Sequence, residues 1–164
     1  MAAEWWVLNA SPLITLSRVG LEHLLHELPE RVCMPRAIAV EIEAGPKEDG
    51  ARKALKSGPF PIIELPSNSP EILTWDLGSG ETAVLSYTRA EAGWTAILDD
   101  DAARRCARSF AIPVKGTLAV ILLAKQRGLI PSAAEVLREL RSLDFRLNDR
   151  IIREALAKTV GESW

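Results

Sequence analysis

The stretch Thr95-Ala96-Ile97-Leu98-Asp99-Asp100-Asp101 joins a short apolar run to three consecutive carboxylates. Repulsion among adjacent carboxylates is relieved by a hard divalent cation, and Mg²⁺ and Mn²⁺ prefer such oxygen ligands. The same acids also suit the start of a helix near Ala102, because the helix dipole favours negative charge at that end. The triplet therefore predicts the end of a strand that carries either a metal site or a helix cap.

Apolar runs of strand length alternate with stretches of helical period along the chain. This alternation predicts an α/β fold with a mainly parallel sheet. We expect strands at residues 5–8, 31–34, 60–65, 95–98 and 112–114. We expect helices at residues 13–16, 21–28, 35–42, 49–57, 80–92, 102–109, 116–128, 132–143 and 149–160, and a loop at residues 66–70.

The composition predicts one globular domain over residues 1–164, with the closing helices at about 132–160 packed on it. Of the 164 residues, 48% are hydrophobic, which suffices for one core and not for two large domains. Charge interrupts every apolar stretch before the ~20 residues of a membrane span, and the N-terminal Met-Ala-Ala-Glu lacks the basic start of a signal peptide. We therefore expect a cytoplasmic protein without a membrane segment.

The net charge argues against nucleic-acid binding by overall attraction, and the cysteines argue against a zinc site. The net charge of −2 gives no overall attraction for nucleic acid, so phosphate binding would need a local patch or a bound metal. Cys33 and Cys106 show no Cys-x-x-Cys spacing and no nearby histidine that would complete a zinc site. We expect both to be reduced packing residues.

Four acidic or amide side chains fall where a parallel sheet brings its strand ends together. Asn9 ends the first predicted strand and Asp100 the fourth, while Glu41 and Glu81 lie on helices beside those ends. Ligands of open α/β sheets bind beyond the carboxyl ends of the strands. Taken singly, Glu41 is explained as a solvated helix residue and Glu81 as compensation of the helix dipole. Together with Asp100 they favour a metal site.

Several short motifs, in this order and spacing, connect the chain to a known family. They are Asn9-Ala10-Ser11-Pro12-Leu13, Pro35 with Ile38 and Glu41, Gly78-Ser79-Gly80-Glu81, Leu98-Asp99-Asp100 with Ala103-Arg104, and Val114-Lys115-Gly116-Thr117 followed by Ala124-Lys125 and Gly128-Leu129-Ile130. Over nearly its whole length the chain resembles PIN-domain proteins, in a branch related to the VapC-type toxin ribonucleases of bacterial and archaeal toxin/antitoxin pairs.

The resemblance implies a three-layer α/β/α PIN-like fold with an acidic pocket that binds Mg²⁺ or Mn²⁺ and hydrolyses RNA phosphodiesters. Carried over by position, Glu41, Glu81 and Asp100 would be metal ligands or supporting acids, with Asp99 beside them. Asn9 departs from the pattern, because most active PIN nucleases carry an aspartate there. A neutral amide weakens the hold on a divalent ion unless a neighbouring carboxylate compensates.

Basic residues near the acids are candidates for contacts with single-stranded RNA. Arg104, Arg105 and Arg108 lie on the helix after the acidic triplet, and Lys115 lies on the next strand. Each would bind a phosphate of the substrate backbone. The alternative for each is a surface cation that pairs with a carboxylate or faces solvent.

The resemblance also implies partners, namely an antitoxin protein and a second copy of the chain. Two rival functions remain open. A phosphoacceptor receiver domain also has aspartates at strand ends and a later lysine, but it needs an acidic pair after the first strand, where this chain has Asn9-Ala10-Ser11. The stronger rival is a PIN-like module that has lost catalysis and binds only nucleic acid or a protein.

Overall fold

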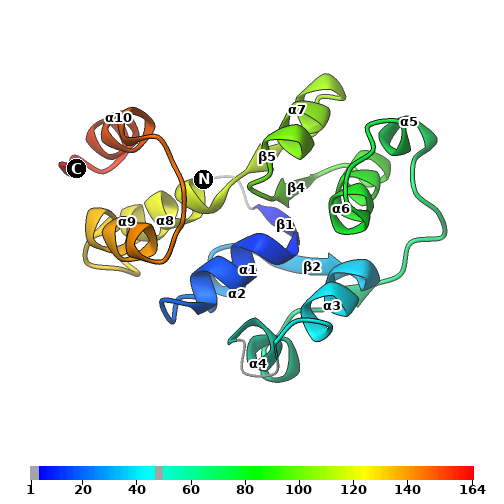
Figure 1. The fold of residues 1–164 in the computed structure, drawn as a ribbon, viewed down its shortest axis with the longest axis horizontal. Coiled ribbons are helices and arrows are strands. Elements are labelled where there is room, and N and C mark those ends of the chain that lie inside the picture. Colours follow the sequence, from blue (N-terminus) through cyan, green and yellow to red (C-terminus); the bar gives the residue numbers. More distant parts are fainter. Residues whose placement is uncertain (1–3, 47–49) are drawn as a thin grey trace.

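The computed structural model describes residues 4–46 and 50–164. Within these ranges five strands form one sheet in the order β3-β2-β1-β4-β5, and every neighbouring pair is parallel (Figure 1). The predicted α/β fold with a parallel sheet is confirmed. The strands are β1 (Trp5–Leu8), β2 (Arg31–Pro35), β3 (Ile62–Ile63), β4 (Trp94–Ile97) and β5 (Val114–Lys115).

The strand order places the two most buried strands next to each other. The chain runs outward from β1 through β2 to β3, returns to the other side of β1 to form β4, and continues to β5. The strand order therefore reverses between β1 and β4. In open parallel sheets such a reversal opens a crevice at the carboxyl ends of the two strands, because their following segments diverge to opposite sides.

Helices cover both sides of the sheet, which makes the three layers that the sequence predicts (Figure 1). α6 contacts β1, β2 and β4, whereas α2 contacts β2 and α8, and α9 and α10 pack on α8. The helices are α1 (Ala10–Ser17), α2 (Leu24–Glu27), α3 (Arg36–Glu43), α4 (Gly50–Ser57), α5 (Pro70–Leu73), α6 (Ser79–Ala90), α7 (Asp101–Ser109), α8 (Thr117–Gln126), α9 (Ala133–Ser142) and α10 (Asp149–Thr159).

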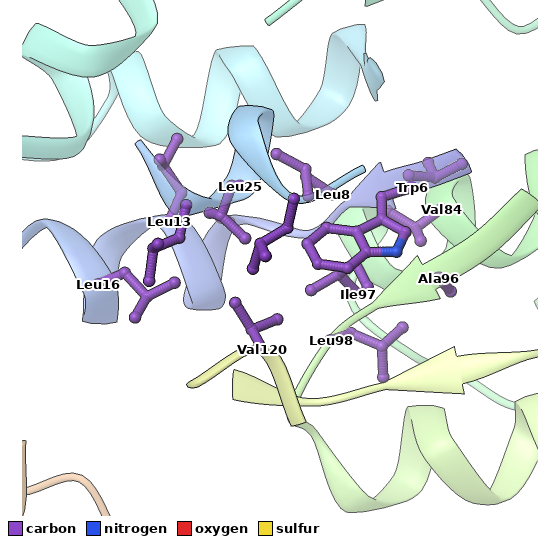
Figure 2. Close-up of a cluster of buried hydrophobic side chains, with 14 of the residues drawn as sticks. Trp6, Leu8, Leu13, Leu16, Leu25, Val84, Ala96, Ile97, Leu98 and Val120 are labelled. Atoms are coloured by element: carbon purple, nitrogen blue, oxygen red, sulfur yellow. The ribbon is translucent and has the colours of Figure 1, made fainter. Parts of the chain in front are cut away.

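The core lies between β1, β4 and the helices on each side of them. Trp6, Leu8 and Ile97 are fully buried there, and Figure 2 shows them with labelled side chains from α1, α2, α6 and α8. Strands buried on both faces read as continuous apolar runs, which explains why these strands were recognisable in the sequence. The core fixes the position of the strand ends that carry the acidic residues.

Several predicted boundaries are wrong for identifiable reasons. The strand expected at residues 60–65 shrinks to β3, because Pro61 has no N–H and β3 pairs only with β2 at the edge of the sheet. The helix expected at residues 21–28 is shorter, because its first residues form hydrogen bonds between residues three apart, and only α2 is α-helical. Pro70 opens α5 in the region expected to be a loop. The first residue of the helix expected at 49–57 lies outside the described residues.

Two other expectations concern the whole molecule. Cys33 and Cys106 are buried and free, as predicted, and burial raises the pKa of the Cys33 thiol to about 12 despite the nearby charge of Arg31. Such a thiol stays protonated and acts as a packing residue. In the described ranges, every helix is too short or too polar to cross a bilayer.

Candidate functional site

Asn9 lies at the carboxyl end of β1, where the strand order reverses. It directly follows β1, and its backbone N–H donates to the carbonyl oxygen of Ile97, the last residue of β4, at 3.0 Å. The residue is 3% exposed, and its side-chain Oδ1 has no hydrogen-bond partner among the described residues. An unpaired buried acceptor costs about 1–3 kcal/mol. The amide oxygen is therefore available to a ligand.

Gly80 shows which groups surround that oxygen. A Cβ at Gly80 would lie 2.7 Å from Oε2 of Glu41, 2.8 Å from Cδ1 of Ile38 and 3.4 Å from Oδ1 of Asn9. The buried second residue of α6 thus forms the floor of a small cradle, closed by α3 on one side and the end of β1 on the other. The structure brings Asn9 and Glu41 together, and only glycine leaves the cradle open.

Glu41 is in an unfavourable position for a carboxylate. Burial of the carboxyl group, followed by the charge of Glu81, raises its pKa above the ordinary value of 4.5. The residue as a whole is exposed at the surface of α3, so it is the carboxylate end that turns inward toward Gly80. A divalent cation in the cradle would relieve both the burial and the repulsion.

Glu81 lies on the other side of Gly80 and turns back over the start of its own helix. Its Oε2 lies 2.5 Å from the position that a Cβ on Gly78 would occupy. Gly78 caps α6 without a side-chain hydrogen bond. The carboxylate of Glu81 therefore stands near the unpaired N–H groups of the first turn, as dipole compensation predicts, and its charge still reaches Glu41.

Asp99 and Asp100 have defined partners at the end of β4. Asp99 is half-buried, and its Oδ1 accepts a hydrogen bond from the backbone N–H of Thr117 at 2.7 Å. Asp100 is exposed, and its Oδ2 accepts from the N–H of Ala103 at 2.9 Å. Asp100 is thus the N-cap of α7, one of the two roles predicted for the acidic triplet.

Three of the four predicted cations, Arg104, Arg105 and Lys115, occupy different environments. Arg104 donates to the carbonyl oxygen of Leu98 at 3.3 Å, and a Cβ on Gly116 would lie 2.8 Å from its Nη1 and 2.8 Å from Oδ1 of Asp99. Arg105 is exposed on α7. Lys115 forms an ion pair with Glu4. Arg104 is therefore the cation nearest to the acids, while Lys115 is already neutralised.

Sequence reasoning missed one polar group at this edge of the sheet. The hydroxyl of Ser11, the second residue of α1, is buried and has no hydrogen-bond partner in the part of the chain that the structure describes. Ser11 follows Asn9 by two residues at the carboxyl end of β1. The signal in the sequence was this short spacing, which puts both side chains in the turn from strand to helix.

The oxygen atoms around Gly80 suit a hard cation, although they include fewer carboxylates than a metal site formed entirely by protein side chains. Over residues 4–46 and 50–164, no three His, Cys, Asp or Glu side chains converge on one point. The cradle instead combines the carboxylate of Glu41, the unpaired amide oxygen of Asn9 and the nearby charge of Glu81. Mg²⁺ and Mn²⁺ accept such oxygen ligands and keep several waters in the remaining positions. The residues present therefore fit such an ion.

One comparison with known proteins finds a family for the chain. A family model described as a PIN domain matches residues 5–161. The match includes all five strands and every candidate site residue. A comparison with curated proteins gives no significant match.

Proposed function

Because the chain belongs to the PIN-domain family, we propose that it is a divalent-metal-dependent ribonuclease that hydrolyses phosphodiesters of single-stranded RNA. The family has a nuclease-type fold and generally uses divalent metal ions. The observation that supports this activity best is the cradle at Gly80, where the carboxylate of Glu41 meets the unpaired, buried amide oxygen of Asn9.

The proposed roles follow from the positions of the side chains. Glu41 and Asn9 would hold the cation, with Glu81 beside them and Asp99 and Asp100 at the neighbouring strand end. The chemistry that Mg²⁺ or Mn²⁺ supplies in such a site is polarisation of a phosphoryl oxygen and activation of water. Glu81, whose charge acts on Glu41, is our candidate for orienting the attacking water.

Positive charge near the acids would position the substrate. Arg104 is already held against the carbonyl of Leu98 beside Asp99, so a phosphate bound there would meet a fixed guanidinium. Arg105 is exposed and free to reach the RNA backbone. Lys115 would have to leave Glu4 to do so, and we expect it to contribute least.

The resemblance to toxin ribonucleases extends the proposal to partners. We propose that the chain is the toxin of a toxin/antitoxin pair, that it acts on RNA in the cytoplasm, and that an antitoxin and a second copy of the chain are its partners. Co-purification of the tagged chain with its genomic neighbour, followed by a cleavage assay with and without that neighbour, tests the toxin role separately from the ribonuclease activity.

A second function is favoured by the identity of residue 9. Asparagine supplies a neutral oxygen where a carboxylate would hold the ion more strongly, and within the described residues Glu41 is the one carboxylate that borders the cradle at Gly80. The alternative is therefore a catalytically weakened PIN-like module that binds nucleic acid or a protein. The cleavage experiment distinguishes the two.

The decisive experiment is cleavage of a labelled single-stranded RNA by the purified protein with Mn²⁺ or Mg²⁺. Parallel reactions contain EDTA, the Glu41→Gln variant and the Asp100→Ala variant. We expect metal-dependent cutting that disappears with EDTA and with Glu41→Gln. Equal cutting by the wild type and Glu41→Gln would indicate a contaminating nuclease, and no cutting by either would favour the binding module.

A further inference from the structure

A groove lies beside Asp99, just beyond the carboxyl end of β4. It has a volume of about 560 Å³ and begins at Asp99 and Gly116. Its two walls are α7 with the start of α8, and the segment from Phe145 to Asn148 with the following helix α10. The groove therefore shares Asp99 with the proposed site.

Arginines line this groove in a protein whose net charge is negative. Arg104 and Arg108 extend from α7, and Arg146 comes from the opposite wall. Among the described residues none of the three forms an ion pair, although five other cations do. The acids of the groove, Asp99 and Asp101, lie at its end near the strand edge. Three arginines against two aspartates give the lining a net positive formal charge, and most of its other side chains are apolar, among them Leu118, Leu122 and Ile151.

The wall that carries Arg146 is held in place. Nη2 of Arg141 donates to the carbonyl oxygen of Leu147 at 2.6 Å, and Nη1 of the same guanidinium lies 2.8 Å from a carboxylate oxygen of Asp149. Phe145 is half-buried in this wall, and its backbone N–H donates to the carbonyl oxygen of Leu140 at 3.0 Å. The groove therefore presents an aromatic ring on a fixed segment, opposite a helix with two arginines.

From this arrangement we propose that the groove binds the single strand on one side of the scissile phosphate. Arg108 and Arg146 contact successive phosphates, and one base stacks on Phe145. Arginines that track a backbone, together with an aromatic platform for bases, are what recognition of single strands requires. The inference rests on the proposed ribonuclease function for the substrate class, but its own content is binding by α7 and the 145–148 segment.

The test measures binding without cleavage. Fluorescence anisotropy in the presence of EDTA follows a labelled oligouridine RNA of about 12 nucleotides, a length within the range that a single-strand-binding OB-fold covers. The variants are Phe145→Leu, Phe145→Trp, Arg108→Glu and Arg146→Glu. Lys56→Glu is the matched charge reversal, because Lys56 is exposed on α4, far from α7 and α10 (Figure 1).

We expect Phe145→Leu and each arginine reversal to weaken binding by about tenfold, and Phe145→Trp and Lys56→Glu to leave it within about twofold. Each arginine reversal should also reduce the slope of log affinity against log salt concentration by about 0.7. The proposal is overturned if the wild type does not bind the strand, or if the groove variants bind it as the wild type does. In the second case the groove is open to a helix of a protein partner.

Cleavage by the same variants separates this inference from the proposed function. If the wild type binds through the groove and cuts no RNA, the groove is supported and the ribonuclease activity is rejected. If the wild type cuts RNA and the groove variants cut equally well at RNA concentrations far below saturation, the ribonuclease activity stands and the groove proposal is rejected.

Discussion

The carboxylate of Asp99 accepts two hydrogen bonds from Thr117, one from the backbone N–H at 2.7 Å and one from the hydroxyl at 2.6 Å. Asp99 follows β4 and Thr117 is the first residue of α8, so this pair joins two elements across the edge of the sheet. The negative charge also stands at the positive end of the α8 dipole. Asp99 therefore has a structural task beside its proposed place in the site.

Substitutions in this pair should separate the two roles of Asp99. Thr117→Val removes only the hydroxyl bond, and we expect it to lower the free energy of unfolding by about 1 kcal/mol with cleavage retained. Asp99→Ala removes both bonds and leaves the N–H of residue 117 unpaired, which should cost about 2–3 kcal/mol. Urea unfolding in EDTA measures both values. Equal costs for the two variants would show that the backbone bond contributes nothing.

Gly80→Ala should close the cradle without disrupting the fold. The added methyl would stand 2.7 Å from Oε2 of Glu41 and 2.8 Å from Cδ1 of Ile38, so the carboxylate must move. We expect cleavage to fall by about 100-fold, the effect of a displacement of about 1 Å in an active site. Stability should change little, because alanine favours the helix by about 1 kcal/mol.

Ser79→Ala is the control for this variant, since Ser79 is the exposed preceding residue of α6. It should cleave RNA as the wild type does. The melting temperature with and without Mn²⁺ supplies an independent measurement, in which the wild type and Ser79→Ala are stabilised by the ion and Gly80→Ala is not. Full activity in Gly80→Ala would remove the cradle from the site.

Glu41→Gln should stabilise the protein in EDTA while it abolishes cleavage. The pKa of Glu41 is raised in the folded state by burial and by Glu81, so the folded chain holds this proton more tightly than the unfolded chain. Stability therefore falls as the pH rises from about 4.5 through the raised pKa, and the neutral glutamine avoids this loss. Melting temperatures measured in EDTA from about pH 4 to about pH 8, across and above the ordinary titration of carboxylates, test the sign of this stability difference.

In that comparison the wild type and Glu41→Gln should converge at the acid end and diverge toward neutral pH, with the variant the more stable. Because part of Glu41 is exposed, the difference will be small, no more than about 2 °C. A variant that is less stable than the wild type at neutral pH would contradict the assignment of Glu41 as an uncompensated carboxylate.

Asn9→Asp distinguishes a weakened nuclease from a binding module. The new carboxylate would face Glu41 in the crevice, so we expect lower stability in EDTA, and binding of Mn²⁺ that is tighter by about tenfold or more. Cleavage should rise above that of the wild type. Calorimetric titration with Mn²⁺ and the RNA assay measure the two effects. Tighter binding of the ion without any cleavage would identify a module that lacks other catalytic groups.

Glu162 near the C-terminus provides a prediction that is independent of the site. Burial alone would raise the pKa of this carboxyl. Hydrogen bonds from Ser132, Ala133 and Ala134 at the start of α9 outweigh burial, so the pKa is lowered on balance. A lowered pKa stabilises the fold above about 4.5, and this contribution is lost as the pH falls through the folded value. Glu162→Gln should therefore cost about 1–2 kcal/mol at pH 7 and little near pH 3. Urea unfolding at both pH values measures the difference, and an equal cost at both would exclude the charge as its cause.

The sequence was sufficient to predict the strands that form the core. β1 and β4 are short, mostly apolar and mostly buried runs, and the polar residues after them, Asn9 and Asp99, mark their carboxyl ends. The family resemblance, confirmed by the match over residues 5–161, added the order of the layers. The edge strand β3 was overestimated, because pairing with one neighbour depends on tertiary contacts that a proline-containing run does not reveal.

The sequence predicted part of the arrangement at the strand ends, while the roles of these residues stay predictions. The motif spacing indicated that Asn9 and Glu41 converge, and the structure places both at Gly80. The partners of Asp99 and Asp100 were not predictable in the same way, because a carboxylate at a strand end suits a helix cap and a metal equally well. The metal-ligand role of Asp100 stays a prediction, to be weighed against its bond to Ala103.

The unpaired amide oxygen of Asn9 has a consequence for turnover of the protein. An ion that satisfies this oxygen in the proposed site binds the folded chain and not the unfolded one, and so shifts the balance between them toward the folded state. Proteases that cut the unfolded chain then act more slowly when the ion is abundant. The half-life of the protein, and with it the amount that accumulates, would follow the supply of the ion.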